Sequence, residues 1–139
     1  MLLHDEVSVL RGVPLFAGME TSKLKLLAFA SDRVIFEPGH ILYRKGDSAD
    51  SAYVILSGEV DLIDETPGGQ VNVGTSGART VVGEVAILSD KPRAHTVQAR
   101  SRVETLRITK DHFHKLLACC PGTMAQIIRV LGERMALAS

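Results

Sequence analysis

The fold is decided by one stretch of the sequence, RVIFEPGHILYRKGDSADSAYVILSGEVDLI, residues 33–63. It contains short runs rich in β-branched and aromatic residues, and the glycine-containing breaks PGH, KGDSAD and SGE separate them. Such runs favour strands, and glycine, proline and aspartate favour tight turns. The strands are too short and too evenly spaced for a parallel sheet with long crossovers. The stretch therefore predicts a compact β sandwich or barrel.

The same pattern continues beyond this stretch, and helical patterns lie on both sides of it. Further strands are predicted at QVNV, HTVQA and RVETLRI, and Glu84 to Leu88 reads as a short inserted helix because GEVAILS does not alternate. In the N-terminal part we expect a helix capped by Thr21 or Ser22, and Thr109 is expected to cap a helix after the last strand. Apolar residues at helical spacing then predict an amphipathic C-terminal helix: Met124, Ile127, Ile128, Leu131 and Met135.

Composition indicates one globular domain and excludes several classes of function. The chain has 139 residues, of which 45% are hydrophobic and 23% charged, as in ordinary globular proteins. Sixteen basic and sixteen acidic residues cancel, so no basic excess predicts nucleic-acid binding by this chain alone. No apolar run approaches the ~20 residues of a membrane span, so no membrane insertion is expected. The adjacent Cys119 and Cys120 make no disulfide framework, and together with the lack of a signal peptide they predict a cytoplasmic protein.

The stretch VGEVAILSDKPRAHTV, residues 82–97, carries the residues that suggest a chemistry. If Glu84 starts a short helix, the free N–H groups at its first turn favour an anion such as a phosphate. Arg93 can supply a forked cation to phosphate oxygens, whereas the carboxylate of Glu84 suits a sugar hydroxyl. The pattern thus fits the ribose-phosphate of a nucleotide. Spacing alone leaves a second interpretation open, in which Glu84 and Arg93 form a surface ion pair.

Residues 82–97 resemble the phosphate-binding cassette of the cyclic nucleotide-binding domain family. That family includes the regulatory subunits of cyclic-AMP-dependent protein kinase, the bacterial catabolite activator protein and nucleotide-gated channels. The likeness covers nearly the whole chain, with GVPLFAGME resembling the N-terminal helical segment and ITKDHFHKLLACCP resembling the helix after the β-roll. The turns of residues 37–63 also match, at Gly39, Gly46, Asp47, Tyr53 and Gly58.

The resemblance implies a mainly β fold, a jelly-roll-like β-roll (double-stranded β-helix) with N-terminal helices, a short inserted phosphate-binding helix and C-terminal helices. It implies a single cyclic nucleotide-binding domain over residues 1–139. Within it we expect a helical segment, a β-roll, a cassette inside that roll and C-terminal helices, at residues 1–31, 32–108, 82–96 and 109–138.

The resemblance also assigns roles to individual residues. It implies that Glu84 accepts a hydrogen bond from the ribose 2′-hydroxyl and that Arg93 pairs with the cyclic phosphate. The expected site also contains the cassette glycine, Gly83, and the backbone amides of Val85, Ala86 and Ala94 around the phosphate. Val73 and Val82 are expected to form walls for the base. Arg134 and Met135 are candidates for a lid, although Met135 also fits the apolar stripe. A threonine after the arginine tends to accompany cyclic GMP in this family, so Ala94 favours cyclic AMP.

Three features depart from the family pattern. His95 stands where a small residue is usual; it could touch the phosphate when protonated, or strand alternation could turn it away from the pocket. The segment TSGART, residues 75–80, lacks the usual hydrophobic residue and turn before the cassette. In the bacterial activators the last helix continues into adenine contacts, a dimer interface and a helix-turn-helix, whereas this sequence stops at Ser139.

The sequence therefore predicts a regulatory module that binds cyclic AMP, or less favourably cyclic GMP, and moves its C-terminal helix, residues 122–138, in response. It predicts no enzyme, no cofactor and no metal site, because His112 and His114 lie on different faces of the expected helix and no nucleophile has a base nearby. The downstream protein partner is not identified by the sequence. Two alternatives are a degenerate β-roll that binds proteins without nucleotide, and the sensor half of a transcription regulator that lacks its DNA-binding domain.

Overall fold

The computed structural model describes residues 3–16, 19–119 and 129, and within these ranges the strands form two four-stranded antiparallel sheets. The first sheet has the order β1-β8-β3-β6 and the second the order β2-β7-β4-β5. The strands are β1 (Asp32–Phe36), β2 (Ile41–Tyr43), β3 (Ser51–Ser57), β4 (Val60–Thr66), β5 (Gly69–Ser76), β6 (Val81–Val82), β7 (Thr96–Ala99) and β8 (Val103–Thr109). The helical elements are α1 (Leu3–Arg11), the 3₁₀ turn η1 (Pro14–Phe16), α2 (Thr21–Ala30), α3 (Glu84–Ser89) and α4 (Lys110–Cys119). The predicted β-roll with flanking helices is confirmed.

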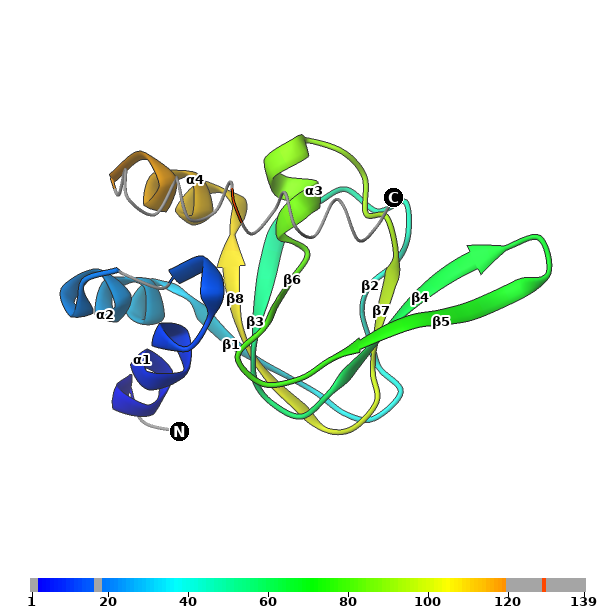
Figure 1. Cartoon of the computed structure of the whole chain (residues 1–139), viewed down its shortest axis with the longest axis horizontal. Coiled ribbons are helices and arrows are strands. Elements are labelled where there is room, and N and C mark those ends of the chain that lie inside the picture. The colour runs from blue at the N-terminus through cyan, green and yellow to red at the C-terminus, as the bar shows by residue number, and fades with distance from the viewer. Residues whose placement is uncertain (1–2, 17–18, 120–128, 130–139) are drawn as a thin grey trace.

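The helices are distributed unevenly around the roll. Figure 1 shows α1, α2 and α4 together beside the first sheet, whereas α3 sits at one end of the roll, between β6 and β7. The hairpin of β4 and β5 extends away from the helices as a long two-stranded arm. Helix α3 thus links β6 of the first sheet to β7 of the second, and its Ile87 packs in the same apolar cluster as residues of α1, α2 and α4.

Strand β3 is buried on both faces, which explains why its sequence does not alternate between apolar and polar residues. All residues from Ser51 to Leu56 are buried. Ala52, Val54 and Leu56 pack in the cluster that the helices cover, whereas Tyr53 and Ile55 pack in a second cluster inside the roll. Because both faces of this strand are covered, both faces are apolar.

The two predicted helix caps have different outcomes. The amide of His112 donates to the hydroxyl of Thr109 at 3.3 Å, so Thr109 caps α4 as predicted. The prediction for α2 is wrong: Glu20 occupies the N-cap position without a side-chain cap, and Thr21 is the first helical residue. The Thr21 hydroxyl instead accepts a hydrogen bond from the guanidinium of Arg11 in α1, so it contributes to packing between two helices.

The segment TSGART, residues 75–80, carries the chain from β5 in the second sheet to β6 in the first sheet. β5 continues through Ser76, and Arg79 then adopts a left-handed conformation with φ +67°. The amide of Arg79 donates to Ile55 O at 2.9 Å, and the amide of Ile55 donates to Thr80 O at 2.9 Å. These bonds bring the chain beside β3 and start β6, the strand that leads into α3.

Candidate functional site

The short helix α3 begins and ends at residues with left-handed backbone. Gly83, with φ +91°, is its N-cap, and Asp90, with φ +54°, is its C-cap. The sequence predicted a helix over 84–88; the observed helix is longer by one residue. Because β6 ends at Val82, the left-handed Gly83 turns the chain directly from strand into helix.

Arg93 is held at this end of the roll by backbone contacts with the loop after β2. Its amide donates to Asp47 O, and its carbonyl accepts from the amide of Gly46, both at 2.9 Å. The guanidinium donates through Nη1 to Gly83 O at 2.8 Å and through Nη2 to Ser51 O at 2.5 Å. One arginine thus joins the start of α3, the start of β3 and the loop after β2.

The charge of Arg93 is poorly compensated by other groups of the described chain. The residue is 3% exposed, and its Nε is buried without a hydrogen-bond partner among residues 3–16, 19–119 and 129. The carboxylate of Asp50 lies 4.0 Å from Nη2, beyond hydrogen-bond distance, and its side chain is 74% exposed. Since a buried cation is costly without a nearby anion, the arrangement favours an anionic ligand at Arg93.

Glu84 is also buried, with 1% of its surface exposed, at the first position of α3. Burial of both Glu84 and Arg93 makes the surface ion-pair interpretation wrong. The two side chains belong to one region, because Gly83, which precedes Glu84, accepts the hydrogen bond from Arg93. The structure therefore brings together the two residues that the sequence singled out.

The other predicted site residues lie at different depths. Val82 and Ala86 are buried, and Val82 belongs to the apolar cluster inside the roll. Val85 is half-buried and Ala94 is exposed. Val73 is 52% exposed and is the extra residue of a bulge in β5, since Leu62 pairs with Gly74 and Ile63 pairs with Asn72. The roles of these residues toward a ligand stay predictions.

Tyr43 is a residue of this region that the sequence reasoning missed as a site residue. Its ring lies under the guanidinium of Arg93, with Cζ 4.1 Å from the ring centroid, and stacks on Tyr53 at 6.4 Å between centroids. The signal in the sequence was an aromatic residue directly before the RKGD turn, in a strand that otherwise carries aliphatic side chains. The sequence alone did not identify Tyr43 as a site residue, because its contact with Arg93 depends on the fold.

His95 lies next to a surface ion pair. Ile63 pairs with Thr96 across β4 and β7. The adjacent residues, Asp64 and His95, lie close enough for their charges to interact. Lys45 donates to the carboxylate of Asp64 at 2.9 Å. This hydrogen bond, aided by the charge of Lys45, the amide of Glu65 and the charge of His95, outweighs desolvation and holds the pKa of Asp64 below its ordinary 3.8.

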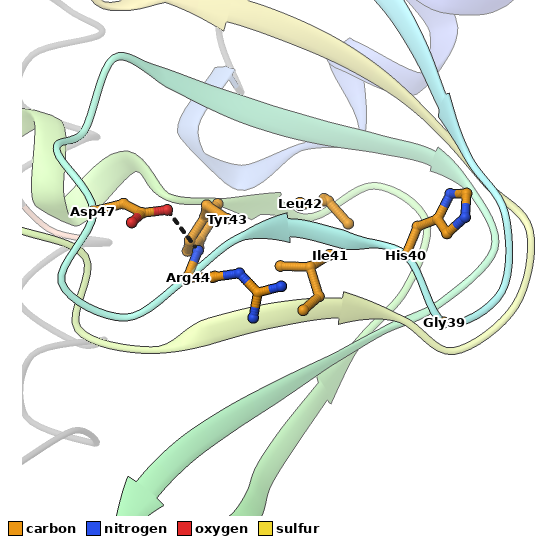
Figure 2. A pocket seen from close by; sticks show the side chains of 7 residues that line it. All are labelled: Gly39, His40, Ile41, Leu42, Tyr43, Arg44 and Asp47. Atoms are coloured by element: carbon orange, nitrogen blue, oxygen red, sulfur yellow. Dashed lines mark hydrogen bonds between the residues drawn. The ribbon is translucent and has the colours of Figure 1, made fainter.

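A surface depression of about 500 Å³ lies beside the Arg93 region, along β2. Figure 2 shows its lining residues: Gly39, His40, Ile41, Leu42, Tyr43, Arg44 and Asp47. The amide of Arg44 donates to the carboxylate of Asp47 at 3.1 Å, which closes the turn at one end. The depression shares Tyr43 and Asp47 with the surroundings of Arg93, but Arg93 itself does not line it.

Several further predictions concern absences or residues beyond the described ranges. Across residues 3–16, 19–119 and 129, no three His, Cys, Asp or Glu side chains are grouped so that they could hold a metal ion. No helix within those ranges is long and apolar enough to cross a membrane. The predicted helix 122–138, with the candidate lid residues Arg134 and Met135, lies outside the described residues except for position 129.

The profile of one protein family matches the sequence of the cassette and of the β-roll around it. The profile described as "Cyclic nucleotide-binding domain" matches residues 33–119, well over half of the chain. The chain belongs to the cyclic nucleotide-binding domain family. The family resemblance drawn from residues 82–97 is thereby confirmed, while membership leaves the particular ligand open.

Relatives in this family include regulators and an enzyme. The chain is 29% identical to a "CRP-like cAMP-activated global transcriptional regulator" of Mycobacterium tuberculosis over 94% of its own length and 58% of that regulator's. It is 35% identical to the cAMP-dependent protein kinase regulatory subunit of Mucor circinelloides, over 76% of this chain and 25% of the subunit. It also matches 7% of the lysophospholipase nte1 of Aspergillus fumigatus, at 30% identity over 77% of the chain. The chain thus spans only part of the length of these relatives.

Solved structures support the same fold. The regulatory domain of Toxoplasma gondii PKA, crystallised with cAMP, superimposes with a TM-score of 0.78 at 26% identity, covering 82% of this chain and 44% of that chain. The regulatory subunit of a cAMP-independent protein kinase A from Trypanosoma brucei gives 0.80 at 26% identity, covering 95% and 46%. The sensor domain of the regulator DNR from Pseudomonas aeruginosa gives 0.85 at 21% identity, covering 98% and 92%; at that identity the likeness concerns the fold alone.

Proposed function

We propose that this domain binds cyclic AMP, with Arg93 on the cyclic phosphate and Glu84 on the ribose 2′-hydroxyl. The observation that carries the proposal is the buried guanidinium of Arg93. Among the described residues its Nε has no hydrogen-bond partner, and the nearest carboxylate oxygen, on Asp50, lies 4.0 Å from Nη2. The fork of a guanidinium matches the oxygens of a phosphate, as it does those of a carboxylate. The first turn of α3, with Gly83, Val85 and Ala86, starts beside it, since Gly83 O accepts a hydrogen bond from Arg93. The amides of a first helical turn have no partner inside the helix and favour an anion.

The choice of cyclic AMP rests on Ala94 and on the named relatives. Ala94 has no hydroxyl to offer to a ligand next to Arg93, whereas the family resemblance implies that a threonine at this position tends to accompany cyclic GMP. The Mycobacterium tuberculosis regulator is described as cAMP-activated, and the Toxoplasma domain was crystallised with cAMP. The Trypanosoma brucei relative is described as cAMP-independent, so the ligand must be tested for each member.

The domain is proposed to act as a regulatory module of the cytoplasm without catalysis of its own. Ligand binding would be passed to a protein partner through the C-terminal helix that the sequence predicts over residues 122–138. Binding shifts that helix only to the extent that the ligand interacts differently with its two positions. A second candidate is the sensor part of a transcription regulator. This candidate is favoured by the Mycobacterium tuberculosis regulator, because 94% of this chain aligns with 58% of the length of that regulator.

Titration of the chain with cyclic AMP and cyclic GMP tests the proposal. A ligand that binds only the native state stabilises it by about 3 kcal/mol at 100 times its Kd, so cyclic AMP is expected to raise Tm by several degrees. Isothermal titration calorimetry should give a lower Kd for cyclic AMP than for cyclic GMP, and adenosine, which lacks the phosphate, should produce no shift. If neither cyclic nucleotide changes Tm or releases heat, the β-roll is an interaction module without nucleotide and the proposal is wrong.

Glu84→Gln tests the assignment of the sugar. Replacing a charged acceptor with a neutral amide weakens the hydrogen bond to the 2′-hydroxyl, and we expect a loss of about tenfold in cyclic AMP affinity. The matched ligand is 2′-deoxy-cyclic AMP, which lacks that hydroxyl and should bind the parent chain and the variant equally, as measured by calorimetry. Equal losses for both ligands would mean that Glu84 acts on the fold of α3 and not on the sugar.

A further inference from the structure

An aromatic ladder runs from the end of β1 to the guanidinium of Arg93. The rings of Phe36 and Tyr53 meet edge to face, with centroids 5.8 Å apart. Tyr53 and Tyr43 are stacked at 6.4 Å with 24° between their planes, and Tyr43 lies under Arg93 at 4.1 Å. The ladder therefore connects the apolar interior of the roll with the one buried arginine of the described chain.

An irregularity in β2 brings Tyr43 into this position. Ile41 pairs with Gln98 and Tyr43 pairs with Val97, so β2 has one extra residue, Leu42, between the two pairs. In a regular strand, neighbouring residues point to opposite faces. Because of the bulge, Leu42 and Tyr43 both pack in the cluster inside the roll.

The ring of Tyr43 lies against a face of the guanidinium and not against the N–H donors at its edges. An arginine has five N–H donors in the plane of the guanidinium. Single bonds to Gly83 O and Ser51 O use one hydrogen of Nη1 and one of Nη2, and Nε–H has no partner in the described chain. A cation–π contact on the face is thus compatible with in-plane hydrogen bonds to an anion.

We propose that Tyr43 is a positioning residue of the ligand site, which fixes the plane of the Arg93 guanidinium so that its remaining in-plane donors meet the anion. The inference rests on the proposed function for the identity of the ligand, but the contact itself does not. Tyr43 also limits the space at the start of α3, since a Cβ on Gly83 would lie 3.3 Å from its Cε2. The ring therefore touches both elements that would surround a bound phosphate.

The composition of the chain provides a direct optical readout of this site. The chain has two tyrosines and no tryptophan, and both tyrosines are in the ladder. In the variant Tyr53→Phe, Tyr43 is the only remaining fluorescent residue of significance. Pairing of Arg93 with an anion changes the field on the Tyr43 ring, so cyclic AMP should change the tyrosine fluorescence of Tyr53→Phe.

The test compares Tyr43→Leu with Tyr43→Phe by calorimetry with cyclic AMP. Phenylalanine keeps the ring face, so its Kd should stay within about threefold of the parent, whereas leucine removes the cation–π contact and should raise Kd about tenfold. Val71→Ala, which changes a 47% exposed apolar side chain of the β5 edge strand, serves as a surface control for Tm. If the parent chain binds cyclic AMP and Tyr43→Leu binds it equally well, Tyr43 does not position Arg93, while the proposed function stands.

A double-mutant cycle separates failure of this inference from failure of the proposed function. If the parent chain binds neither cyclic AMP nor cyclic GMP, the proposed function is wrong, and the contact is then measured by thermal unfolding of Tyr43→Leu, Arg93→Met and the double variant. A double variant whose loss in Tm is smaller than the sum of the single losses supports the positioning of Arg93 by Tyr43. Additive losses would overturn it.

Discussion

Arg93→Ala is expected to weaken cyclic AMP binding by about 100-fold or more, the largest loss that a single substitution produces in this domain. Arg93 is 3% exposed as a residue, so hydrogen bonds from its guanidinium to a phosphate would form away from bulk water. Charge-assisted bonds in such a place are about twice as strong as neutral ones, and a loss of about 3 kcal/mol corresponds to about 100-fold in Kd. Calorimetry with cyclic AMP measures the loss.

Two control variants make this result specific. Arg93→Lys keeps the charge but not the fork, so it should recover only part of the affinity. Arg102→Ala removes a half-exposed arginine that pairs with Glu37 and Glu104 at 3.6 and 3.5 Å, and it should leave the Kd unchanged. An unchanged Kd for Arg93→Ala would place the phosphate elsewhere in the roll and refute the site.

Arg93→Ala should lower the free energy of unfolding less than it lowers the free energy of cyclic AMP binding. Arg93 is buried with backbone carbonyls as its hydrogen-bond partners, so its removal also removes a poorly compensated buried charge. The gain offsets part of the cost of leaving Gly83 O and Ser51 O without their donor. A group that contributes little to folding and much to binding is what an anion site requires.

Turn chemistry and spacing made much of the fold predictable from the sequence. The glycine-rich breaks between short apolar runs marked β1 to β4, and the loss of alternation at Glu84 marked α3. Thr109 was predictable as a cap because its hydroxyl acts on the chain three residues away. Thr21 was not, because its hydroxyl contacts Arg11, ten residues away in another helix. Local hydrogen bonds can be predicted from local sequence, whereas contacts between elements require the fold.

The site shows the same division between local and distant information. Glu84 and Arg93 were predictable because both lie in one short segment of the chain. Tyr43 was not identified, because it is fifty residues before Arg93 and reaches it only through the bulge at Leu42. The crossing of the chain at Arg79 was equally hidden, since it depends on hydrogen bonds with Ile55 in β3. Residues that complete a site from another strand are found only when strand register is known.

Gly83→Ala is expected to reduce cyclic AMP affinity by more than tenfold, because it disturbs the partner of Arg93 and the start of α3 together. The backbone of Gly83 has φ +91°, and an added Cβ would lie 2.4 Å from Nη1 of Arg93. A side chain in this left-handed conformation costs about 1 kcal/mol, and the contact forces the guanidinium to move from its place over Tyr43. Since a shift of about 1 Å in a charged group can cost about 100-fold in a preorganised site, we expect the loss in affinity to exceed the loss in stability.

Gly39→Ala is the matched control for this prediction. Gly39 has φ +88°, and an added Cβ there would meet nothing within 4 Å. Both variants therefore carry a similar backbone strain, which should lower Tm in each. Gly83→Ala should lower Tm further, because its Cβ also contacts Arg93. Calorimetry should then show full cyclic AMP affinity for Gly39→Ala and reduced affinity for Gly83→Ala. Equal affinities in the two variants would mean that the guanidinium moves without consequence, and that its position over Tyr43 is not the one in which it meets the ligand.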